Sequence, residues 1–260
     1  MKVHELLSGI LSNESSFGRL MTRCGVIIGA NLMFILFSFP VVTAGAAYVA
    51  LYHVMFKALR GDGVINPFKQ FWIGFKSNFK QATIAWICVL ALLLLGFMDL
   101  RICMDAGGVI AAFRYPLYAL GVGLCIIVIY LLPTMAAFQD TIPHLIRNSL
   151  FFAFRKPHKL LVMLFFNVFP MYLTYSDLQM MPLYAFLWCF FGFGAIAMLD
   201  AYLLLPEFKP YLPLVDDCGD FILDENGEKI WADSEAIAEV SGRQEKSQEE
   251  ILEEMRKLGM

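Results

Sequence analysis

Long apolar segments are the feature that most limits what this chain can fold into. Crossing the apolar core of a bilayer takes about 20 helical residues, with a range of about 17–25. The first segment is just long enough, with 17 uncharged residues from Val26 to Val42, and the last four are sufficient. The sequence predicts an all-α, multi-span membrane protein with about six transmembrane helices. They cover roughly residues 25–42, 44–58, 81–98, 115–138, 160–176 and 181–205.

Composition supports this prediction and excludes two other classes. The chain is 59% hydrophobic and 17% charged, whereas ordinary soluble domains are about 45–50% apolar and about 25% charged. A chain of 260 residues cannot bury this excess in a soluble core, because a domain of that size still exposes much of its surface. A typical soluble enzyme and a disordered protein are therefore excluded.

The second segment, residues 44–58, is short for a membrane span. Its uncharged part ends at Phe56, so a full crossing requires Lys57 to extend its side chain toward the interface. The alternative is a re-entrant segment, which would leave five spans. Charge placement favours six, because five spans would put the basic loop after residue 57 opposite Arg19 and Arg23.

Lysine and arginine set the predicted orientation. They are more frequent in cytoplasmic loops than in outer loops. Six spans with both termini in the cytoplasm of a bacterium put 11 of the 13 loop Lys and Arg residues inside, leaving only Arg101 and Arg114 outside. We therefore predict a multi-pass protein of the bacterial cytoplasmic membrane.

Two cytoplasmic loops each predict a basic amphipathic helix in the membrane interface. The first follows Asn66-Pro67, a pair that favours a helix start, and the second follows Pro143. Their basic residues are candidates for contact with anionic lipid or a partner protein. The alternative is that both helices simply pack on the ends of the spans. The candidates are Lys69, Lys76, Lys80, Arg147, Arg155, Lys156 and Lys159.

The two loops also resemble each other. Residues Phe75–Lys80 (FKSNFK) align with Phe154–Lys159 (FRKPHK) without a gap. Each lies in a unit that runs span, interfacial helix, span. The similarity predicts a parallel internal repeat, as occurs in some transporters.

Four polar residues inside the apolar segments form a candidate intramembrane site: Asn31, Thr43, His53 and Asp200. An ionisable residue inside a membrane is costly and commonly functional, so Asp200 could bind a solute or couple an ion. The alternative for Asp200 is a pair with Arg23 or His53. Thr43 follows Pro40, which removes a backbone donor, so Thr43 could instead satisfy the freed carbonyl in a tight turn.

The C-terminal residues 206–260 differ from the rest of the chain. Residues 216–260 carry 5 Lys/Arg and 14 Asp/Glu, a net charge of −9, whereas residues 1–215 carry +6. We predict a membrane domain over 1–205 and an acidic cytoplasmic tail. The tail is expected to hold a β-hairpin at 221–231, around an Asn-Gly turn, and a short helix at 247–258. Opposite charges suggest that the tail docks on the basic loops.

A family resemblance rests on the first hairpin. Asn31-Leu32 and the string Ser38–Gly45 (SFPVVTAG), followed by Phe71-Trp72 and Asn78–Gln81 (NFKQ), resemble the YesL-like bacterial integral membrane proteins. The activity of that family is not established. The resemblance implies an accessory role in carbohydrate uptake, because family members are found with such systems.

We expect a non-enzymatic protein without cofactors or metals, because no nucleophile elbow, phosphate-binding loop, dinucleotide fingerprint or metal-ligand spacing occurs in the sequence. The favoured function is an accessory or interaction component of a carbohydrate uptake system. A small-solute transporter or channel and an anionic-lipid-binding protein are the alternatives. Expected partners are membrane lipids, a protein of the uptake system or a second copy of the chain, and not nucleic acid.

Overall fold

The computed structural model describes residues 16–61, 65–106 and 108–213. The structure is 92% helical, with no strand among the described residues. Six of its helices are long and apolar enough to cross a membrane. The predicted all-α class is confirmed.

The first hairpin joins α2 (Ser16–Ser38) to α3 (Ala44–Arg60) through the short 3-10 turn η1 (Val41–Thr43). The chain leaves α2 two residues before Pro40, since the residue preceding a proline avoids helical geometry. Small residues let α3 pack closely on its neighbours. A Cβ atom added at Gly45 would overlap the side chain of Trp86. At 17 residues, α3 is about 26 Å long, and it runs unbroken to Arg60.

The second hairpin joins α4 (Pro67–Ala106) and α6 (Arg114–Ala137) through α5 (Gly108–Ala112). Asn66 caps α4 as predicted, with its side-chain oxygen 3.1 Å from the backbone nitrogen of Phe68. The prediction of a separate interfacial helix over 67–80 is wrong. That segment and the following span form one helix of 40 residues, because no proline follows Pro67 until Pro116.

The last third of the described chain begins with the second predicted amphipathic helix, which is a separate element, α7 (Ile142–Arg155). The apolar segment predicted as one helix over 181–205 is divided into three parts by a π-helical turn, η3. The remaining elements are α8 (Pro157–Ser176), η2 (Leu178–Met180), α9 (Met181–Leu187), η3 (Trp188–Gly192), α10 (Phe193–Phe208) and η4 (Lys209–Tyr211).

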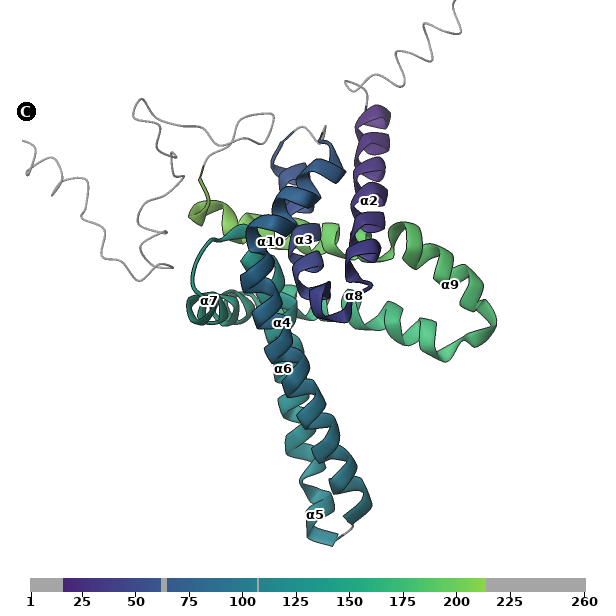
Figure 1. Ribbon diagram of the computed structural model, residues 1–260, viewed down its shortest axis with the longest axis vertical. Coiled ribbons are helices and arrows are strands. Elements are labelled where there is room, and N and C mark those ends of the chain that lie inside the picture. The colour runs from purple at the N-terminus through teal and green to yellow at the C-terminus, as the bar shows by residue number, and fades with distance from the viewer. Residues whose placement is uncertain (1–15, 62–64, 107, 214–260) are drawn as a thin grey trace, which may run out of the picture.

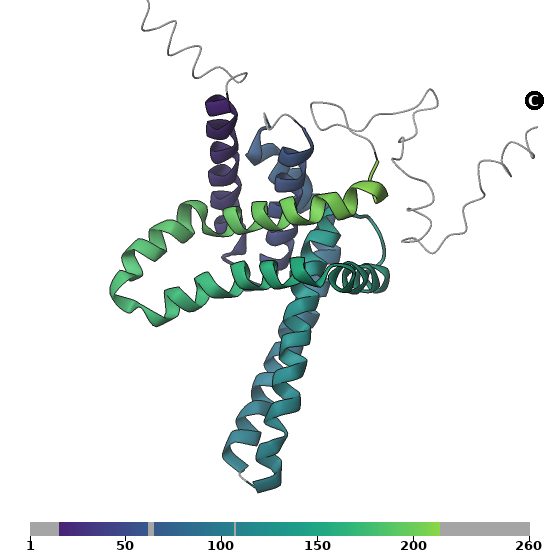
Figure 2. The ribbon, with the colours of Figure 1, turned by 180° about the vertical axis from the view of Figure 1, so that it is seen from behind.

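The helices form a central core from which two hairpins extend in different directions. Helix α3 lies within this core, packed between α2, α4, α6 and α10. The α4–α6 hairpin extends one way, and the hairpin of α8 with α9 and α10 extends another (Figures 1 and 2). Both expose large apolar side chains, such as Leu94 and Tyr172, as expected for helices that face lipid.

The C-terminal boundary differs from the expected one. Helix α10 continues beyond residue 205 to Phe208, and Phe208 and Tyr211 are buried in the core. The membrane domain therefore includes the segment up to Pro213. The hairpin expected at 221–231 and the helix expected at 247–258 lie outside the described residues.

Candidate functional site

Asn31 lies on α2 and contacts the π-helical turn. Its amide nitrogen donates to the carbonyl oxygens of Trp188, at 3.0 Å, and Cys189, at 2.6 Å. Its side-chain oxygen accepts from the backbone N–H of Gly194, at 2.8 Å. A π-turn widens the helix and disturbs its regular hydrogen bonds. Asn31 therefore supplies hydrogen-bond partners to backbone groups at this π-helical turn, and it binds α2 to α10.

Gly194 permits this close approach. A Cβ atom at that position would lie 2.9 Å from the backbone oxygen of Ile27 and 3.3 Å from the Cβ of Asn31. Any side chain would push α10 away from α2. Asn31 is itself fully buried, so its amide serves the packing of these two helices.

Thr43 completes the turn between α2 and α3. Its hydroxyl lies 2.8 Å from the carbonyl oxygen of Phe37 and 2.9 Å from that of Pro40. The indole N–H of Trp86 donates to the carbonyl of Val41, at 2.9 Å. Thr43 and Trp86 thus donate to carbonyl oxygens of this turn, whereas the hydroxyl of Ser38 is buried without a hydrogen-bond partner among the described residues.

His53, on α3, packs against α4. A Cβ atom at Gly74 would lie 2.9 Å from the Cβ and ring atoms of His53, so the imidazole lies directly over this glycine. The ring also lies close to the backbone of Ala136 on α6. His53 thus joins three helices.

Asp200, on α10, is fully buried. Its Oδ2 accepts from the hydroxyl of Tyr52 on α3, at 2.8 Å, and from the amide of Asn167 on α8, at 2.9 Å. These partners replace the Arg23 or His53 pairing weighed from the sequence. Its Oδ1 has no hydrogen-bond partner among the described residues. The hydroxyl of Tyr130 on α6 is also buried without one.

Each of the four predicted residues has its own partners. No hydrogen bond between described residues joins any two of Asn31, Thr43, His53 and Asp200. Asp200 instead gathers Tyr52 and Asn167, which the sequence analysis did not select. Asn167 interrupts the fifth apolar segment, and that interruption was the available signal. Among the described residues, no group of three or more His, Cys, Asp or Glu side chains is placed to hold a metal ion.

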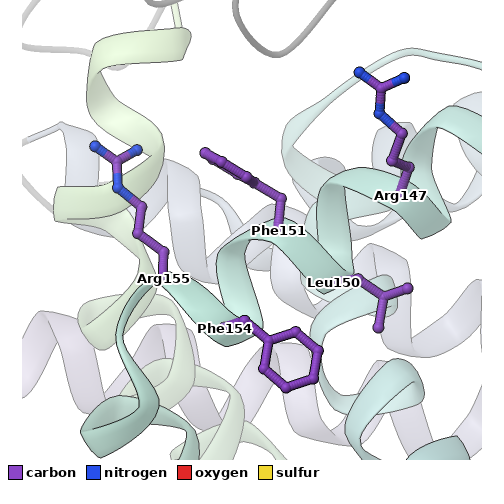
Figure 3. A pocket seen from close by; sticks show the side chains of 5 residues that line it. All are labelled: Arg147, Leu150, Phe151, Phe154 and Arg155. Carbon is purple, nitrogen blue, oxygen red and sulfur yellow. The ribbon is translucent and has the colours of Figure 1, made fainter.

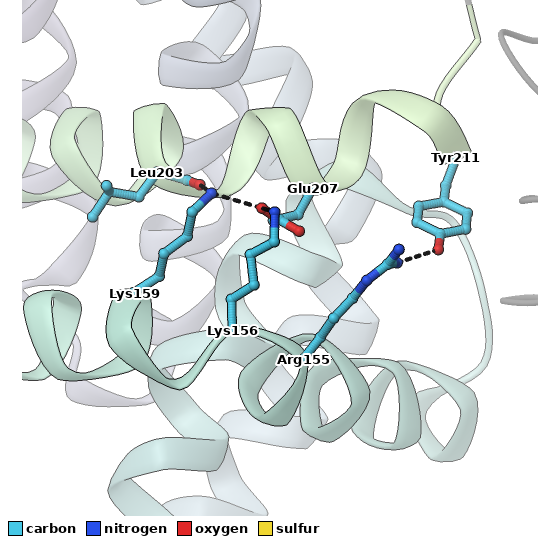
Figure 4. Close-up of polar contacts among 6 residues, drawn as sticks. All are labelled: Arg155, Lys156, Lys159, Leu203, Glu207 and Tyr211. Atoms are coloured by element: carbon cyan, nitrogen blue, oxygen red, sulfur yellow. Dashed lines mark hydrogen bonds and ion pairs between the residues drawn. The ribbon is translucent and has the colours of Figure 1, made fainter.

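The basic residues at the start of α8 contact the end of α10 (Figure 4). The ammonium groups of Lys156 and Lys159 both lie 2.7 Å from the same carboxylate oxygen of Glu207. Lys159 also donates to the carbonyl of Leu203, at 2.7 Å. Glu207 was not selected from the sequence, because it lies two residues beyond the expected end of a span and was assigned to the tail.

Two further arginines contact the segment that follows α10. Arg155 donates to the hydroxyl of Tyr211, at 2.6 Å (Figure 4). Arg60, at the end of α3, donates to the carbonyl of Pro213. Basic side chains from three elements thus hold the last described residues of the chain against the core.

A shallow hollow lies on the exposed side of α7. Arg147 and Arg155 stand at its two ends, with exposed Phe151 and Phe154 between them (Figure 3). Leu150 completes the lining. The guanidinium of Arg155 lies 5.6 Å from the ring centre of Phe151, close enough for a cation–π contact. The hollow therefore presents an apolar floor between two positive charges.

The other three basic candidates lie elsewhere. Lys69, Lys76 and Lys80 are exposed along the N-terminal half of α4. A second hollow adjoins them, and it is polar. Its lining residues are Ser77, Asn78, Gln81, Gln139, Asp140 and Thr141.

Comparison with known proteins gives one match. Residues 27–100 match the model of a family described as a protein of unknown function, DUF624. No curated protein and no solved structure matches the chain. The matched region runs from α2 through most of α4, so it includes Asn31, Thr43 and His53 but neither Asp200 nor α7. Over its first two core helices and the long helix that follows, the chain is similar to this family of unknown function.

Proposed function

We propose that this protein is a non-enzymatic, YesL-like accessory component of a carbohydrate uptake system in the bacterial cytoplasmic membrane. It acts by protein contact at its cytoplasmic face, and the contact surface is centred on α7. The carbohydrate assignment comes from the YesL-like resemblance. The contact surface comes from the geometry of the described residues.

The exposed side of α7 is the observation that carries the proposal. Phe154 is 70% exposed and Phe151 is 38% exposed, and both lie between Arg147 and Arg155. Aromatic residues and arginine are enriched in protein interfaces and supply most of the binding energy there. The opposite side of α7 is already packed in the core, where Leu145 and Phe152 are buried.

The closed core argues in the same direction. A transporter needs a polar cavity that water can reach near the middle of the membrane. Asn31 and Asp200 are fully buried, and neither residue lines the hollow on α7 or the polar hollow beside α4. The described conformation therefore favours a contact function over solute passage.

The proposed orientation puts the N-terminus, α7 and the last described residue, Pro213, on the cytoplasmic side. The three hairpin turns, η1, α5 and η2, then face outward. None of Val41–Thr43, Gly108–Ala112 and Leu178–Met180 contains a lysine or arginine. This placement follows the excess of basic residues in cytoplasmic loops.

Photo-cross-linking in a bacterium that carries the protein tests the proposal. We place a photo-reactive amino acid at position 154 and, as a control, at position 92, where Leu92 is exposed on the distal part of α4. We expect position 154 to form an adduct with a subunit of a carbohydrate uptake system and position 92 to form none. Removing the gene should slow uptake of that carbohydrate, and Arg147→Glu should fail to restore it. Absence of the adduct with unchanged uptake would refute the proposal.

Solute or ion transport is the second candidate, and Asp200 favours it. A buried carboxyl with one unpartnered oxygen is costly in a membrane core, which is typical of a site that exchanges a ligand in another conformation. Flux through liposomes that contain only this protein would support transport if Asp200→Asn abolishes it and Asp105→Asn, at an exposed site on α4, does not. Absence of flux with the wild-type chain would exclude it.

A further inference from the structure

The C-terminal segment is bound to the core by charge, and this binding sets the direction of the chain beyond it. Glu207 lies between Lys156 and Lys159, and Arg155 donates to Tyr211. Arg60 donates to the carbonyl of Pro213, the last residue described before the tail. Basic side chains thus already contact the C-terminal segment up to Pro213, directly before the tail begins.

The hollow on α7 continues this interface. Arg155 belongs to both, since it contacts Tyr211 (Figure 4) and also forms one end of the hollow (Figure 3). Phe152 on the same helix packs against Tyr211, with ring centres 5.6 Å apart. A chain that leaves Pro213 therefore starts two residues after a contact with the Arg155 end of α7.

The residues that follow have the composition to cover that surface. Residues 216–231 contain six Asp/Glu and one Lys, a net charge of −5, together with Phe221, Ile222, Leu223 and Trp231. Acidic groups complement Arg147 and Arg155, and apolar side chains complement Leu150, Phe151 and Phe154. Opposite charges brought together at a partly desolvated surface attract more strongly than in open solvent.

Chain length permits the contact. Eight residues separate Pro213 from Phe221, and an extended chain covers about 3.3–3.6 Å per residue, so Phe221 can reach about 26–29 Å from Pro213. Helix α7 has 14 residues, which makes it about 21 Å long. The stretch from Pro213 to Phe221 is therefore at least as long as α7 when it is extended.

We propose that residues 216–231 dock on the exposed side of α7 and occupy the hollow between Arg147 and Arg155. The inference rests on the proposed function in one respect, because the same surface is the one assigned to the uptake-system partner. Docking of the tail then competes with the partner, and the protein alternates between a self-covered state and a partner-bound state.

Disulfide cross-linking of the full-length chain in detergent tests the docking. In a variant whose six native cysteines are replaced by serine, we combine Phe221→Cys with Phe154→Cys. The control pair combines Phe221→Cys with Phe68→Cys, at a phenylalanine on α4 that is 51% exposed, against 70% for Phe154. We expect the first pair to cross-link at least about tenfold faster at low salt. Its rate should fall severalfold at about 1 M salt, where the Debye length is about 3 Å, and also with Arg147→Glu.

Equal rates for the two pairs, or a rate that salt and Arg147→Glu leave unchanged, would overturn the inference. A cross-linked dimer would assign the surface to a second copy. Protection of position 154 by anionic vesicles, without a cross-link to position 221, would assign it to lipid. Either result would also overturn the inference. Neutralising the six acidic residues of 216–231 is a second variant that leaves the membrane core untouched, and it should slow the cross-link as Arg147→Glu does.

The docking and the proposed function can fail separately. A fast, salt-sensitive cross-link to position 221 without any cellular adduct from position 154 would support docking and refute the partner assignment. If both hold, a chain that ends at residue 215 should give severalfold more partner adduct at position 154 than the full chain. An unchanged adduct yield would refute the competition.

Discussion

The N-terminal half of α4 and the helix α7 look alike in sequence and differ in structure. Both begin near a proline and carry phenylalanines interspersed with basic residues, and Phe75–Lys80 aligns with Phe154–Lys159. The first of these segments lies inside an unbroken helix. The second crosses the break between α7 and α8, where Lys156 has a φ of −137° and a ψ of 80°. The predicted internal repeat therefore does not extend to the backbone of these six residues.

One proline accounts for the break. Lys156 precedes Pro157, and the proline ring disfavours helical geometry in the residue before it. The residue of α4 that aligns with Pro157 is Asn78, which allows the helix to continue. The same pattern of aromatic and basic residues thus extends a span in one case and turns the chain in the other.

Both segments bury some of their aromatic side chains and expose others. In α4, Phe71 and Phe75 pack against Phe37 of α2, with ring centres 5.7 and 4.9 Å apart. In α7, Phe152 is buried but Phe154 is exposed. A similar amphipathic pattern therefore gives a packed and an open face in both segments, since Trp72 and Phe79 of α4 are also exposed.

The largest expected effect separates packed from open aromatic residues. Phe71→Ala should lower the free energy of unfolding by about 3–5 kcal/mol, because the side chain is fully buried and its removal leaves a cavity. Phe154→Ala should change it by less than about 0.5 kcal/mol. Unfolding in mixed micelles with increasing denaturing detergent measures both. Similar losses for the two variants would show that the open face of α7 is packed in solution.

A glycine comparison tests how closely α4 packs on α3. Gly74→Ala should cost about 1–3 kcal/mol, because the new Cβ would lie 2.9 Å from His53 and the close packing cannot accommodate it. Gly96→Ala, in the distal part of the same helix, has no atom within 4 Å and should be neutral or stabilising, since alanine favours helix. If Gly74→Ala were as stable as Gly96→Ala, the packing of α3 on the N-terminal half of α4 would be looser than described.

The ion pairs at the start of α8 should contribute less. Glu207→Gln should lower the free energy of unfolding by about 1–2 kcal/mol, because hydrogen bonds to charged groups contribute about 1.5–3 kcal/mol. The contribution of Lys156 is reduced by solvent screening, since its side chain is 45% exposed. The loss should shrink at high salt. Asp105→Asn, at an exposed site, is the control. No difference between the two would mean that Glu207 does not hold the corner between α8 and α10.

The smallest effect is expected for the exposed lysines of α4. Lys76→Glu and Lys80→Glu should each change stability by less than about 0.5 kcal/mol, because both side chains are exposed on a face that packs against nothing described. The adduct formed at position 154 in cells should stay unchanged as well. A lost adduct would move the contact surface from α7 to α4.

Helix existence was largely predictable, whereas helix boundaries were not. The six apolar segments predicted six long helices because a span needs an apolar stretch of defined length. The sequence did not show that residues 67–80 and the next span form one helix. Amphipathic periodicity indicates a helix, but it does not indicate whether that helix continues into the apolar segment that follows. The π-turn at Trp188–Gly192 was also missed, since its stabilising partner, Asn31, is 157 residues away from Trp188.

In the candidate site, too, some features were predictable from the sequence and others were not. Asp200, Asn31 and Thr43 were visible because a polar residue in an apolar segment must find a partner. Their partners could not be predicted, since each depends on which helices lie side by side. Asp200 meets Tyr52 and Asn167 only because α10 crosses both α3 and α8.

The sequence by itself determined the class of the protein, the number of its long apolar helices and the separation of a basic body from an acidic tail. These properties depend on composition and on the spacing of residues that lie close together in the chain. Only the tertiary structure decided that α3 is central, that α7 turns away at Pro157 while α4 does not turn, and that basic loop residues hold the segment ending at Pro213. Packing between distant helices selects these arrangements, because each buried polar group and each close backbone contact needs a partner that lies far away in the chain.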